Sequence, residues 1–273
     1  MVSERRPSAS AAASSRTRQF GETPNSLPPV SVSVSVSLTR RSTDRARRTG
    51  LGLYHRAASL NYAYGVATTK RTVAGPYRSY EPWNSHGDDS GLAALGTLPD
   101  DAVVVDAGAH VGEYALPLAA AGRTVHAVEP DPVAAERLRA NRSATGVESR
   151  VTVHDCGLGD RDGTATFYRS SAPKGSAFDE TAATRWGARV VERVDRRVAR
   201  LDTLVDDLPP PDALKLDVEG AELAALRGAE RTLREHRPLV VVEPHGTDRE
   251  LRAELVAFGY AVDPYGDCWV CRP

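Results

Sequence analysis

The residues best suited to chemistry lie in one short stretch, Val103 to Tyr114, which reads VVVDAGAHVGEY. Its three valines form a β-branched apolar run that is typical of a strand buried on both faces. Asp106 ends that run, and a turn of small residues containing Gly108 and Gly112 follows. The residues from Glu113 onward predict a helix. Because glycine has no Cβ, a ligand can closely approach the exposed N–H groups of such a turn.

The acid before the turn limits the ligands that this corner would accept. A dinucleotide fingerprint, G-x-G-x-x-G, seats a pyrophosphate on three glycines, whereas this stretch reads D-x-G-x-x-x-G. A carboxylate at Asp106 repels phosphate and suits a cationic amino-acid group. Glu129 ends the next apolar run, Thr124 to Val128, where it can bind ribose hydroxyls. The two acids together predict S-adenosylmethionine, which carries an ammonium and a ribose and has no phosphate.

From residue 103 onward, apolar runs alternate with helical segments, which indicates a parallel sheet with helices on both faces. The predicted strands are 103–105, 124–128, 151–154, 164–169, 194–198, 214–216, 239–242, 260–262 and 269–271. The runs 164–169 and 194–198 are expected to pair with each other, and the last two to form a closing hairpin. The sequence therefore predicts a doubly wound α/β fold.

Acidic residues stand at five successive strand ends: Asp106, Glu129, Asp155, Asp217 and Glu243. Ligands of open α/β sheets bind at the carboxyl ends of the strands, where the strand order reverses. Core packing does not require this pattern, because a buried carboxylate is costly unless it is solvated or paired. We therefore expect the first three of these acids to bind a ligand.

Five stretches of the chain resemble the FkbM-type family of class I S-adenosylmethionine-dependent methyltransferases. They read DAGAHVGEYALPLA, AVEPDPVAAERLRAN, ARLDTLVDD, LKLDVEGAELAALRGA and VVVEPH, and the similarity covers residues 102–258. The resemblance implies a mostly parallel, seven-stranded, Rossmann-like sheet and usually O-methylation of a hydroxyl. It also places the adenine ring of the donor at Asp155 and Cys156. The donor-binding residues are then Asp106, Gly108, His110, Gly112, Glu129, Asp155 and Cys156.

The candidate catalytic residues are Asp217, Glu219 and His245. Asp217 would face the methionine end of the donor, or the acceptor. Glu219 and Glu222 are three positions apart and share one face of the entering helix turn, so their charges could raise one pKa and create a general base. The alternative is that both cap the helix and pair with Lys215 or an arginine. His245 could take a proton from an acceptor hydroxyl, since its free pKa is near neutrality, or it is simply solvated.

The 273 residues suffice for one large α/β domain with extensions. Residues 1–50 hold nine arginines against three acids and few large apolar residues, which predicts a disordered, basic, Ser- and Arg-rich tail. Residues 51–98 predict a helical cap and loop, with helix from Leu51 to Thr69. Residues 99–273 form the predicted methyltransferase domain. The scattered arginines lack interleaved aromatic residues, so no nucleic-acid partner is expected.

No apolar run of the sequence approaches the roughly 20 residues that span a bilayer. Three cysteines, an odd number, argue against a disulfide framework, so we expect a reducing, cytoplasmic environment. The Arg- and Ser-rich start also fits an organelle transit peptide. Cys268 and Cys271 form a C-x-x-C that reads as a terminal strand, and no metal site is predicted.

One segment, Ser170 to Trp186, interrupts the alternation of strands and helices. It exceeds the usual connection of about 4–6 residues, which predicts either a lid over the ligand or a plain surface loop. As a lid, Lys174 and Arg185 would grip an anionic acceptor, while Phe178 and Trp186 would exclude water.

Two other functions are compatible with this fold. An NAD(P)-dependent, sugar-modifying oxidoreductase would need G-x-G-x-x-G or Tyr-x-x-x-Lys, and the sequence contains neither. A non-catalytic S-adenosylmethionine-binding module would keep the fold without turnover, although the strand-end acids are all retained. For a methyltransferase, the expected acceptor is a small molecule or a glycan: sugars, lipid-linked glycans and secondary metabolites all fit.

Overall fold

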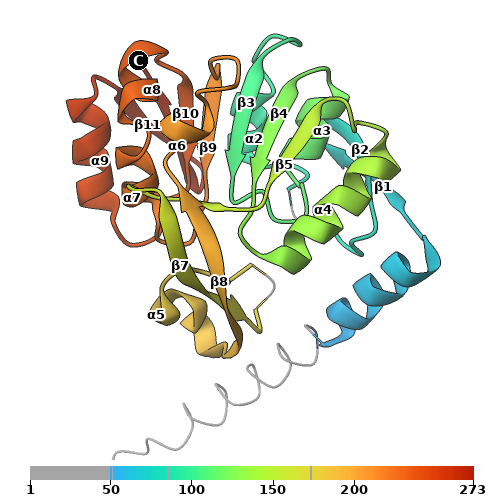
Figure 1. Cartoon of the computed structure of the whole chain (residues 1–273). Coiled ribbons are helices and arrows are strands. Elements are labelled where there is room, and N and C mark those ends of the chain that lie inside the picture. The colour runs from blue at the N-terminus through green and yellow to red at the C-terminus, as the bar shows by residue number, and fades with distance from the viewer. Residues whose placement is uncertain (1–49, 51, 85, 173) are drawn as a thin grey trace, which may run out of the picture. The chain divides into compact units, whose positions relative to one another are not determined.

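A seven-stranded sheet forms the centre of the computed structural model, which describes residues 50, 52–84, 86–172 and 174–273. Its strands are β3 (Val103–Ala107), β4 (Thr124–Val128), β5 (Val151–His154), β9 (Ala213–Leu216), β10 (Leu239–Val242), β11 (Ala261–Tyr265) and β12 (Cys268–Arg272). Their order is β11-β12-β10-β9-β3-β4-β5 (Figure 1). The strands from β10 to β5 run parallel, while β12 pairs antiparallel with both β10 and β11 and is the strand that runs in the opposite direction. The predicted doubly wound, mostly parallel fold is confirmed.

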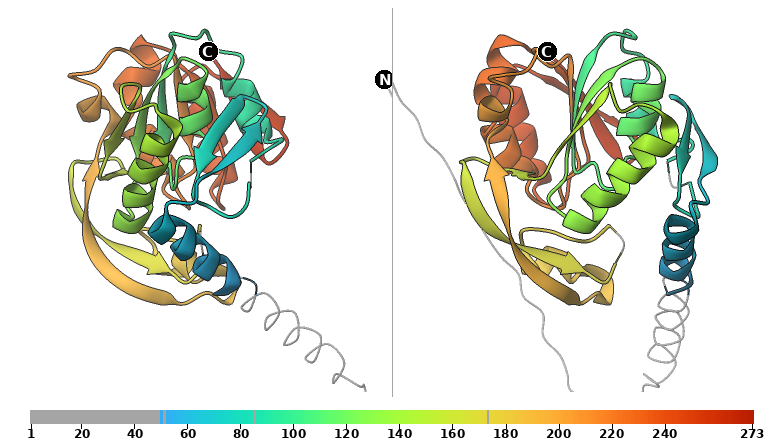
Figure 2. Two further views of the ribbon diagram at one scale, coloured as in Figure 1. Left: turned by 90° about the vertical axis from the view of Figure 1, so that its right-hand side faces the viewer. Right: turned by 45° about the vertical axis from the view of Figure 1, so that its right-hand side comes forward.

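Helices cover both faces of this sheet (Figure 2). The helices named here are α2 (Ser90–Leu95), α3 (Ala115–Ala120), α4 (Pro132–Thr145), α5 (Glu180–Ala183), α6 (Leu201–Leu204), α7 (Glu222–Arg227), α8 (Glu230–Glu235) and α9 (Asp248–Ala257). Leucines of α2, α3 and α4 pack in one hydrophobic core, and leucines of α6 to α9 pack in the other. Asp131 caps α4, as its position before Pro132 predicts, because its side chain accepts the N–H of Val133.

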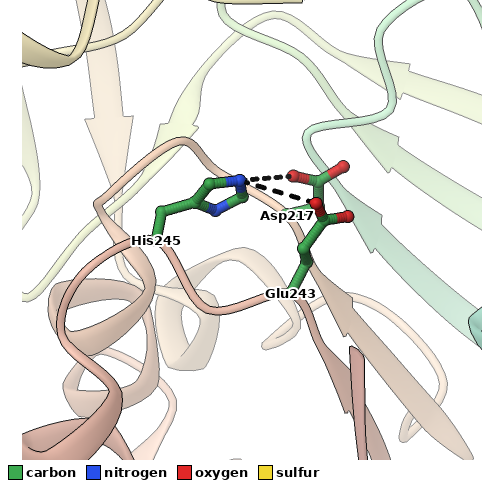
Figure 3. A group of neighbouring side chains, drawn as sticks. All are labelled: Asp217, Glu243 and His245. Atoms are coloured by element: carbon green, nitrogen blue, oxygen red, sulfur yellow. Dashed lines mark ion pairs between the residues drawn. The ribbon is translucent and has the colours of Figure 1, made fainter. Parts of the chain in front are cut away.

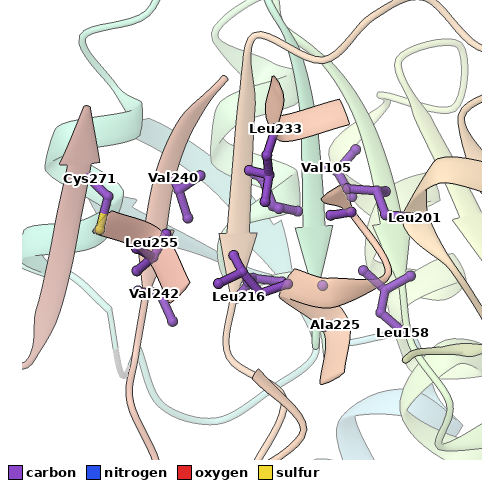
Figure 4. Packing of buried hydrophobic residues seen from close by; sticks show 14 of the residues in the cluster. Val105, Leu158, Leu201, Leu216, Ala225, Leu233, Val240, Val242, Leu255 and Cys271 are labelled. Carbon is purple, nitrogen blue, oxygen red and sulfur yellow. The ribbon is translucent and has the colours of Figure 1, made fainter. Parts of the chain in front are cut away.

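Side chains of each strand alternate between the two cores, as the two-residue period of a strand requires. In β10, Val240 and Val242 pack against α6 to α9, in the core that Figure 4 shows, while Val241 packs on the opposite face. The same alternation separates Cys268 and Cys271 in β12, because each thiol belongs to a different core. The C-x-x-C is therefore part of a terminal strand, as predicted, and its two thiols cannot jointly bind one metal ion.

The strand order reverses between β3 and β9. The chain runs from β3 through β4 to β5 at one edge, then crosses back to place β9 and β10 on the other side of β3. Asp106 and Lys215 are direct neighbours in the register of these two strands. A reversal of this kind leaves a crevice at the carboxyl ends of the strands, so the fold opens a binding site beside Asp106.

A smaller sheet projects from the central one (Figure 1). In it β7 (Gly163–Ser170) and β8 (Val190–Ala199) pair antiparallel, as predicted, and β6 (Gly157–Leu158) extends it along β8. The segment that joins β7 to β8 folds onto this hairpin. It contains α5, and Ala177, Ala182 and Ala183 are buried there. A plain surface loop is therefore the wrong interpretation, while action as a lid stays a prediction.

The cap differs from the prediction in one respect. Residues 52–64 are helical, but the helix predicted as far as Thr69 ends earlier, and β1 (Thr68–Thr72) pairs with β2 (Gly75–Ser79) instead. Gly65 adopts a left-handed conformation with φ +68°, which ends the helix, and the β-branched threonines that follow favour a strand. Apart from Gly50, the predicted tail lies outside the described residues. Among the described helices, none has the length and apolar character needed to cross a membrane.

His126 and His154, on the neighbouring strands β4 and β5, form an imidazole pair. Nδ1 of His126 lies 3.2 Å from Nε2 of His154. Burial, together with the charge of His154, lowers the pKa of His126 to about 4, and burial also lowers the pKa of His154. An unfolded histidine titrates near pH 6.5, so below that pH the unfolded chain takes up protons that the folded chain refuses.

We therefore expect the free energy of unfolding to fall as the pH drops from 6.5 to about 4, by at most about 1.4 kcal/mol per pH unit for each histidine. Urea unfolding followed by circular dichroism at several pH values measures this slope. His126→Gln should make the slope shallower. If the free energy of unfolding changes with pH at the same rate in His126→Gln and in the parent, the histidine pair does not cause the pH dependence.

Candidate functional site

A cavity opens where the strand order reverses, at the carboxyl ends of β3, β4 and β9. Its acidic lining residues are Asp106, Glu113, Glu129, Asp131, Asp217, Glu219 and Glu243. Its larger apolar lining residues are Val128, Leu158, Phe167, Phe178 and Val218. The rings of the two phenylalanines meet edge to face, with their centroids 5.0 Å apart. The cavity thus combines an acidic wall with an aromatic surface.

Asp106 lines this cavity although its side chain is buried. Lys215 on β9 places Nζ 3.1 Å from Oδ1 of Asp106 and 3.5 Å from Oδ2 of Asp217, and donates to the carbonyl of Gly108 at 3.0 Å. Burial alone would lower the pKa of Lys215, but the two carboxylates raise it, so the ammonium stays charged. Oδ2 of Asp106 finds no hydrogen-bond partner within the described part of the chain.

Glu129 ends β4 and is held by the backbone on both sides. Its Oε2 accepts the N–H of His110 at 2.7 Å, and its Oε1 accepts the N–H of Asp131 at 2.8 Å. Burial raises the pKa of Glu129 to about 7. A carboxylate has about four acceptor positions, so Glu129 keeps capacity for hydroxyl donors in the cavity that it lines. His110 also lines the cavity, and its role in donor binding stays a prediction.

The two predicted glycines are required by the fold itself. Gly108 has φ +76°, and a Cβ there would lie 1.8 Å from the carbonyl oxygen of Asp217. Gly112 has φ +95°, and a Cβ there would lie 2.5 Å from the side chain of Leu138 on α4. At both positions, glycine therefore allows two segments of the protein to pack closely against each other. Gly108 also lines the cavity, whereas a role of Gly112 in donor binding stays a prediction.

Asp155 and Cys156 lie apart from the other predicted donor-binding residues. Asp155 is half exposed and pairs with Arg139 of α4 at 2.5 Å, while Cys156 is buried in the core beside α6 to α9. At this strand end the cavity is lined by the next two residues, Gly157 and Leu158. They form β6, which pairs with β8. Donor binding by Asp155 and Cys156 stays a prediction that this geometry does not favour.

The predicted catalytic residues Asp217, Glu219 and His245 come together at the ends of β9 and β10. Figure 3 shows Asp217 and His245 beside Glu243. Nε2 of His245 lies 3.9 Å from Oδ1 of Asp217, 3.9 Å from Oε2 of Glu219 and 3.7 Å from Oε1 of Glu243. Nδ1 of the same ring lies 2.9 Å from Oε1 of Glu222. Burial lowers the pKa of His245, but the bond to Glu222 and the charge of Glu219 outweigh it and raise the pKa to about 9.

Glu219 and Glu222 have separate roles. Glu222 is buried, and its Oε1 accepts the N–H groups of Val218 and Gly220 at 3.2 and 3.0 Å, so it caps the turn before α7, as the capping alternative predicts. Glu219 lines the cavity. Its Oε2 is buried and, in the described chain, accepts no hydrogen bond. Burial raises the pKa of Glu219 to about 7 against the opposing charge of His245. The role of Glu219 as a general base stays a prediction, and its position in the cavity favours that role.

A group of charged residues on the cavity wall includes two that the sequence analysis missed, His86 and Glu113. Nζ of Lys174 lies 2.6 Å from Oε2 of Glu113, and Nε2 of His86 lies 3.4 Å from the same oxygen. Nδ1 of His86 in turn lies 2.8 Å from Asp89. These residues come from the loop before α2, the turn after β3 and the segment after β7. No spacing in the sequence predicts that Lys174, His86 and Glu113 meet, because their contacts depend on how three distant segments fold.

The predicted grip on an anionic acceptor is not supported by this arrangement. Lys174 is engaged by Glu113, and Arg185 places Nη1 3.6 Å from Oε2 of Glu219. Trp186, expected to cover the ligand, is 63% exposed. Phe178 does line the cavity, as the lid prediction requires.

Comparison with known proteins places the chain among methyltransferases. The family model described as the methyltransferase FkbM domain matches residues 106–262. Methyltransferase sdnD from Sordaria araneosa is 29% identical over 201 residues, which cover 62% of this chain and 77% of that protein. The 31-O-demethyl-FK506 methyltransferase FkbM from Streptomyces tacrolimicus is 33% identical over 184 residues, which cover 57% of this chain and 69% of that protein.

Among solved structures, methyltransferase FkbM from Methylobacillus flagellatus KT is similar with 24% identity and a TM-score of 0.47. The match covers 64% of this chain and 45% of that one, so this chain spans less than half of that relative. The family model begins at Asp106 and includes all five strand-end acids. Because that match covers more than half of the chain, this protein belongs to the FkbM methyltransferase family.

Proposed function

We propose that this protein transfers a methyl group from S-adenosylmethionine to a hydroxyl group of a small molecule or glycan. The observation that carries the proposal is the presence of two strand-end acids, Asp106 and Glu129, in one cavity at the reversal of strand order. Within the residues described, Oδ2 of Asp106 is buried and lacks a hydrogen-bond partner, so it fits an ammonium. Glu129 fits a ribose diol. When bound, S-adenosylmethionine supplies a methyl group on a positively charged sulfur.

The charge of the cavity supports this donor over a dinucleotide. Asp106, Glu113 and Glu129 line the turn where a pyrophosphate would lie, and like charges at such short range are costly. The aromatic surface of Phe167 and Phe178 suits the adenine ring, because aromatic faces stack on one another. The oxidoreductase alternative is thus disfavoured both by the family and by the site.

For the acceptor we propose a neutral hydroxyl compound such as a sugar. The cations on the cavity wall are already engaged by acids, Lys174 by Glu113 and Lys215 by Asp106 and Asp217. An anionic acceptor would have to break these pairs. The name of the FK506-related relative specifies an O-demethyl substrate, which supports oxygen as the atom that is methylated.

Glu219 is the proposed proton acceptor. It lines the cavity beside Asp217, and its Oε2 has an unused hydrogen-bonding position among the residues described. As the acceptor oxygen bonds to the methyl carbon, the carbon–sulfur bond of the donor breaks and its electron pair stays on sulfur, which gives S-adenosylhomocysteine. The acceptor's O–H bond breaks as well, and its proton moves to Oε2 of Glu219. Asp217 also lines the cavity, and His245 lies 3.9 Å from both Asp217 and Glu219. In this proposal these two residues orient the hydroxyl. The rest of the catalysis is alignment and exclusion of water.

Glu129→Gln should weaken the binding of S-adenosylhomocysteine about ten- to a hundredfold, because a hydrogen bond to a charged group contributes about 1.5–3 kcal/mol. Isothermal titration calorimetry on the intact protein measures the change. Asp155→Asn is the matched control, and we expect it to change the affinity by less than about twofold. Equal losses in both variants would contradict the donor position proposed here, and no binding to the parent protein would refute the donor itself.

Glu219→Gln should reduce the turnover number about 10²- to 10⁴-fold, the usual contribution of a general base. The affinity for S-adenosylhomocysteine should stay unchanged. Turnover is measured by mass spectrometry as the gain of one CH₂ unit across a panel of neutral hydroxyl compounds, with Glu250→Gln on the exposed face of α9 as the control. Unchanged turnover in Glu219→Gln would exclude this base. A parent protein that binds donor product yet methylates no compound of the panel would favour the non-catalytic module.

A further inference from the structure

The ends of β9 and β10 bring together more negative than positive charge. Four carboxylates lie within 4 Å of the two ring nitrogens of His245: Asp217, Glu219, Glu222 and Glu243. Lys215 is shared between Asp106 and Asp217, and Arg185 pairs with Glu219. Among the groups described, five carboxylates therefore face three basic side chains. The difference is an excess of negative charge, and it grows by one when His245 is neutral, the form in which an imidazole binds a metal ion.

Asp217, Glu243 and His245 direct one possible ligand atom each at a common point (Figure 3). The three atoms lie within 4.8 Å of one another, and Nε2 is 3.9 Å from Asp217 and 3.7 Å from Glu243. Ligand atoms that are each about 2.1 Å from one ion are about 3–4 Å apart. Lys215 contacts Oδ2 of Asp217 and leaves Oδ1 facing the imidazole. Small side-chain movements would close this set around an ion.

Glu222 provides an independent indication of a cation. Its side chain is 0% exposed, and its Oε1 holds Nδ1 of His245, so Nε2 faces the carboxylates. A carboxylate behind the far ring nitrogen is the usual support of a metal-bound histidine. Two more oxygens here, Oε2 of Glu222 and Oε2 of Glu219, are buried and lack a hydrogen-bond partner in the part of the chain described. Oε2 of Glu219 lies 3.9 Å from Nε2 of the His245 imidazole. Oε2 of Glu219 also lies 3.6 Å from Nη1 of Arg185, so among the residues described the unpaired oxygen is Oε2 of Glu222. A buried, unpaired carboxylate oxygen is costly without a cation.

We propose that Asp217, Glu243 and His245 bind one divalent cation at the acceptor end of the cavity. Two carboxylate oxygens and one imidazole nitrogen suit Mn²⁺ or a similar transition-metal ion better than Mg²⁺, which prefers oxygen ligands. Asp217 and Glu243 also line the cavity, so an acceptor hydroxyl can complete the coordination. There the cation would lower the pKa of the hydroxyl, and Glu219, outside the ligand set, would take its proton. This last role rests on the proposed function, whereas the site itself does not.

The direct test is binding of Mn²⁺ to the full chain after treatment with a chelator. Free Mn²⁺ is counted by electron paramagnetic resonance during a titration, and we expect one bound ion per chain. Asp217→Asn, Glu243→Gln and His245→Gln should each weaken binding by at least about tenfold, since even the loss of a supporting residue costs that much. Glu230→Gln makes the same substitution on α8, where Glu230 pairs with Arg234 at 3.0 Å, and should leave binding unchanged.

A spectroscopic signature separates this site from general attraction of cations to acids. Electron spin-echo modulation should detect an imidazole nitrogen bound to Mn²⁺ in the parent protein, and His245→Gln should abolish that signal. Circular dichroism confirms that each variant is folded. Three results would each overturn the proposal: no stoichiometric binding of Mn²⁺, no nitrogen coupling in the parent, or equal Mn²⁺ affinity of His245→Gln and the parent. The cluster would then be an ion-pair network around His245. If the parent protein binds Mn²⁺ and does not bind S-adenosylhomocysteine, the donor proposal is refuted and the metal site is not.

Discussion

One buried ion pair, between Lys215 and Asp106, links the two strands on which the binding site depends. The residues are register neighbours on β9 and β3, at the reversal of strand order, and Nζ lies 3.1 Å from Oδ1. Asp106 is 0% exposed, so its charge needs a partner within the protein, and removal of that partner would leave an uncompensated buried carboxylate. Lys215 also reaches Asp217 and the carbonyl of Gly108. It therefore ties both turns of the cavity to the end of the sheet.

The two turns are built alike. Each contains a non-glycine residue in a left-handed conformation, His110 with φ +48° after β3 and Glu219 with φ +52° after β9. Such a conformation costs about 1–2 kcal/mol for an ordinary residue, and an acid beside each turn accepts its backbone N–H groups. Glu129 accepts from His110, and Glu222 accepts from Gly220. Strained backbone of this kind clusters at functional sites, and here both examples face the same cavity.

The central sheet was predictable because its signals are local. Buried parallel strands are short apolar runs, and β4, β5 and β10 have the bounds that the sequence predicts. Acids at the strand ends meet because the topology gathers those ends, so the meeting of Asp217, Glu219 and His245 also followed from position along the chain. The separation of Cys268 from Cys271 follows from the strand period alone.

Other parts of the site could not be predicted because they depend on contacts between distant segments. Whether Asp155 or the residues after it reach the cavity depends on how β6 lies along β8. The contact of His86 with Glu113 depends on how the loop before α2 folds over the turn after β3. Lys215 did carry a local signal, because a lysine within the buried run LKL needs an acidic partner. Its sharing between two carboxylates, by contrast, emerges only from the three-dimensional structure.

The central claim is that this cavity holds S-adenosylmethionine between the turn after β3 and the acids at the end of β9. A crystal structure with S-adenosylhomocysteine tests it most directly. The account predicts ribose hydroxyls at Glu129, adenine against Phe167 and Phe178, and a sulfur that faces Asp217 and Glu219. A ligand bound outside the cavity, or one whose sulfur points away from Asp217 and Glu219, would contradict the account.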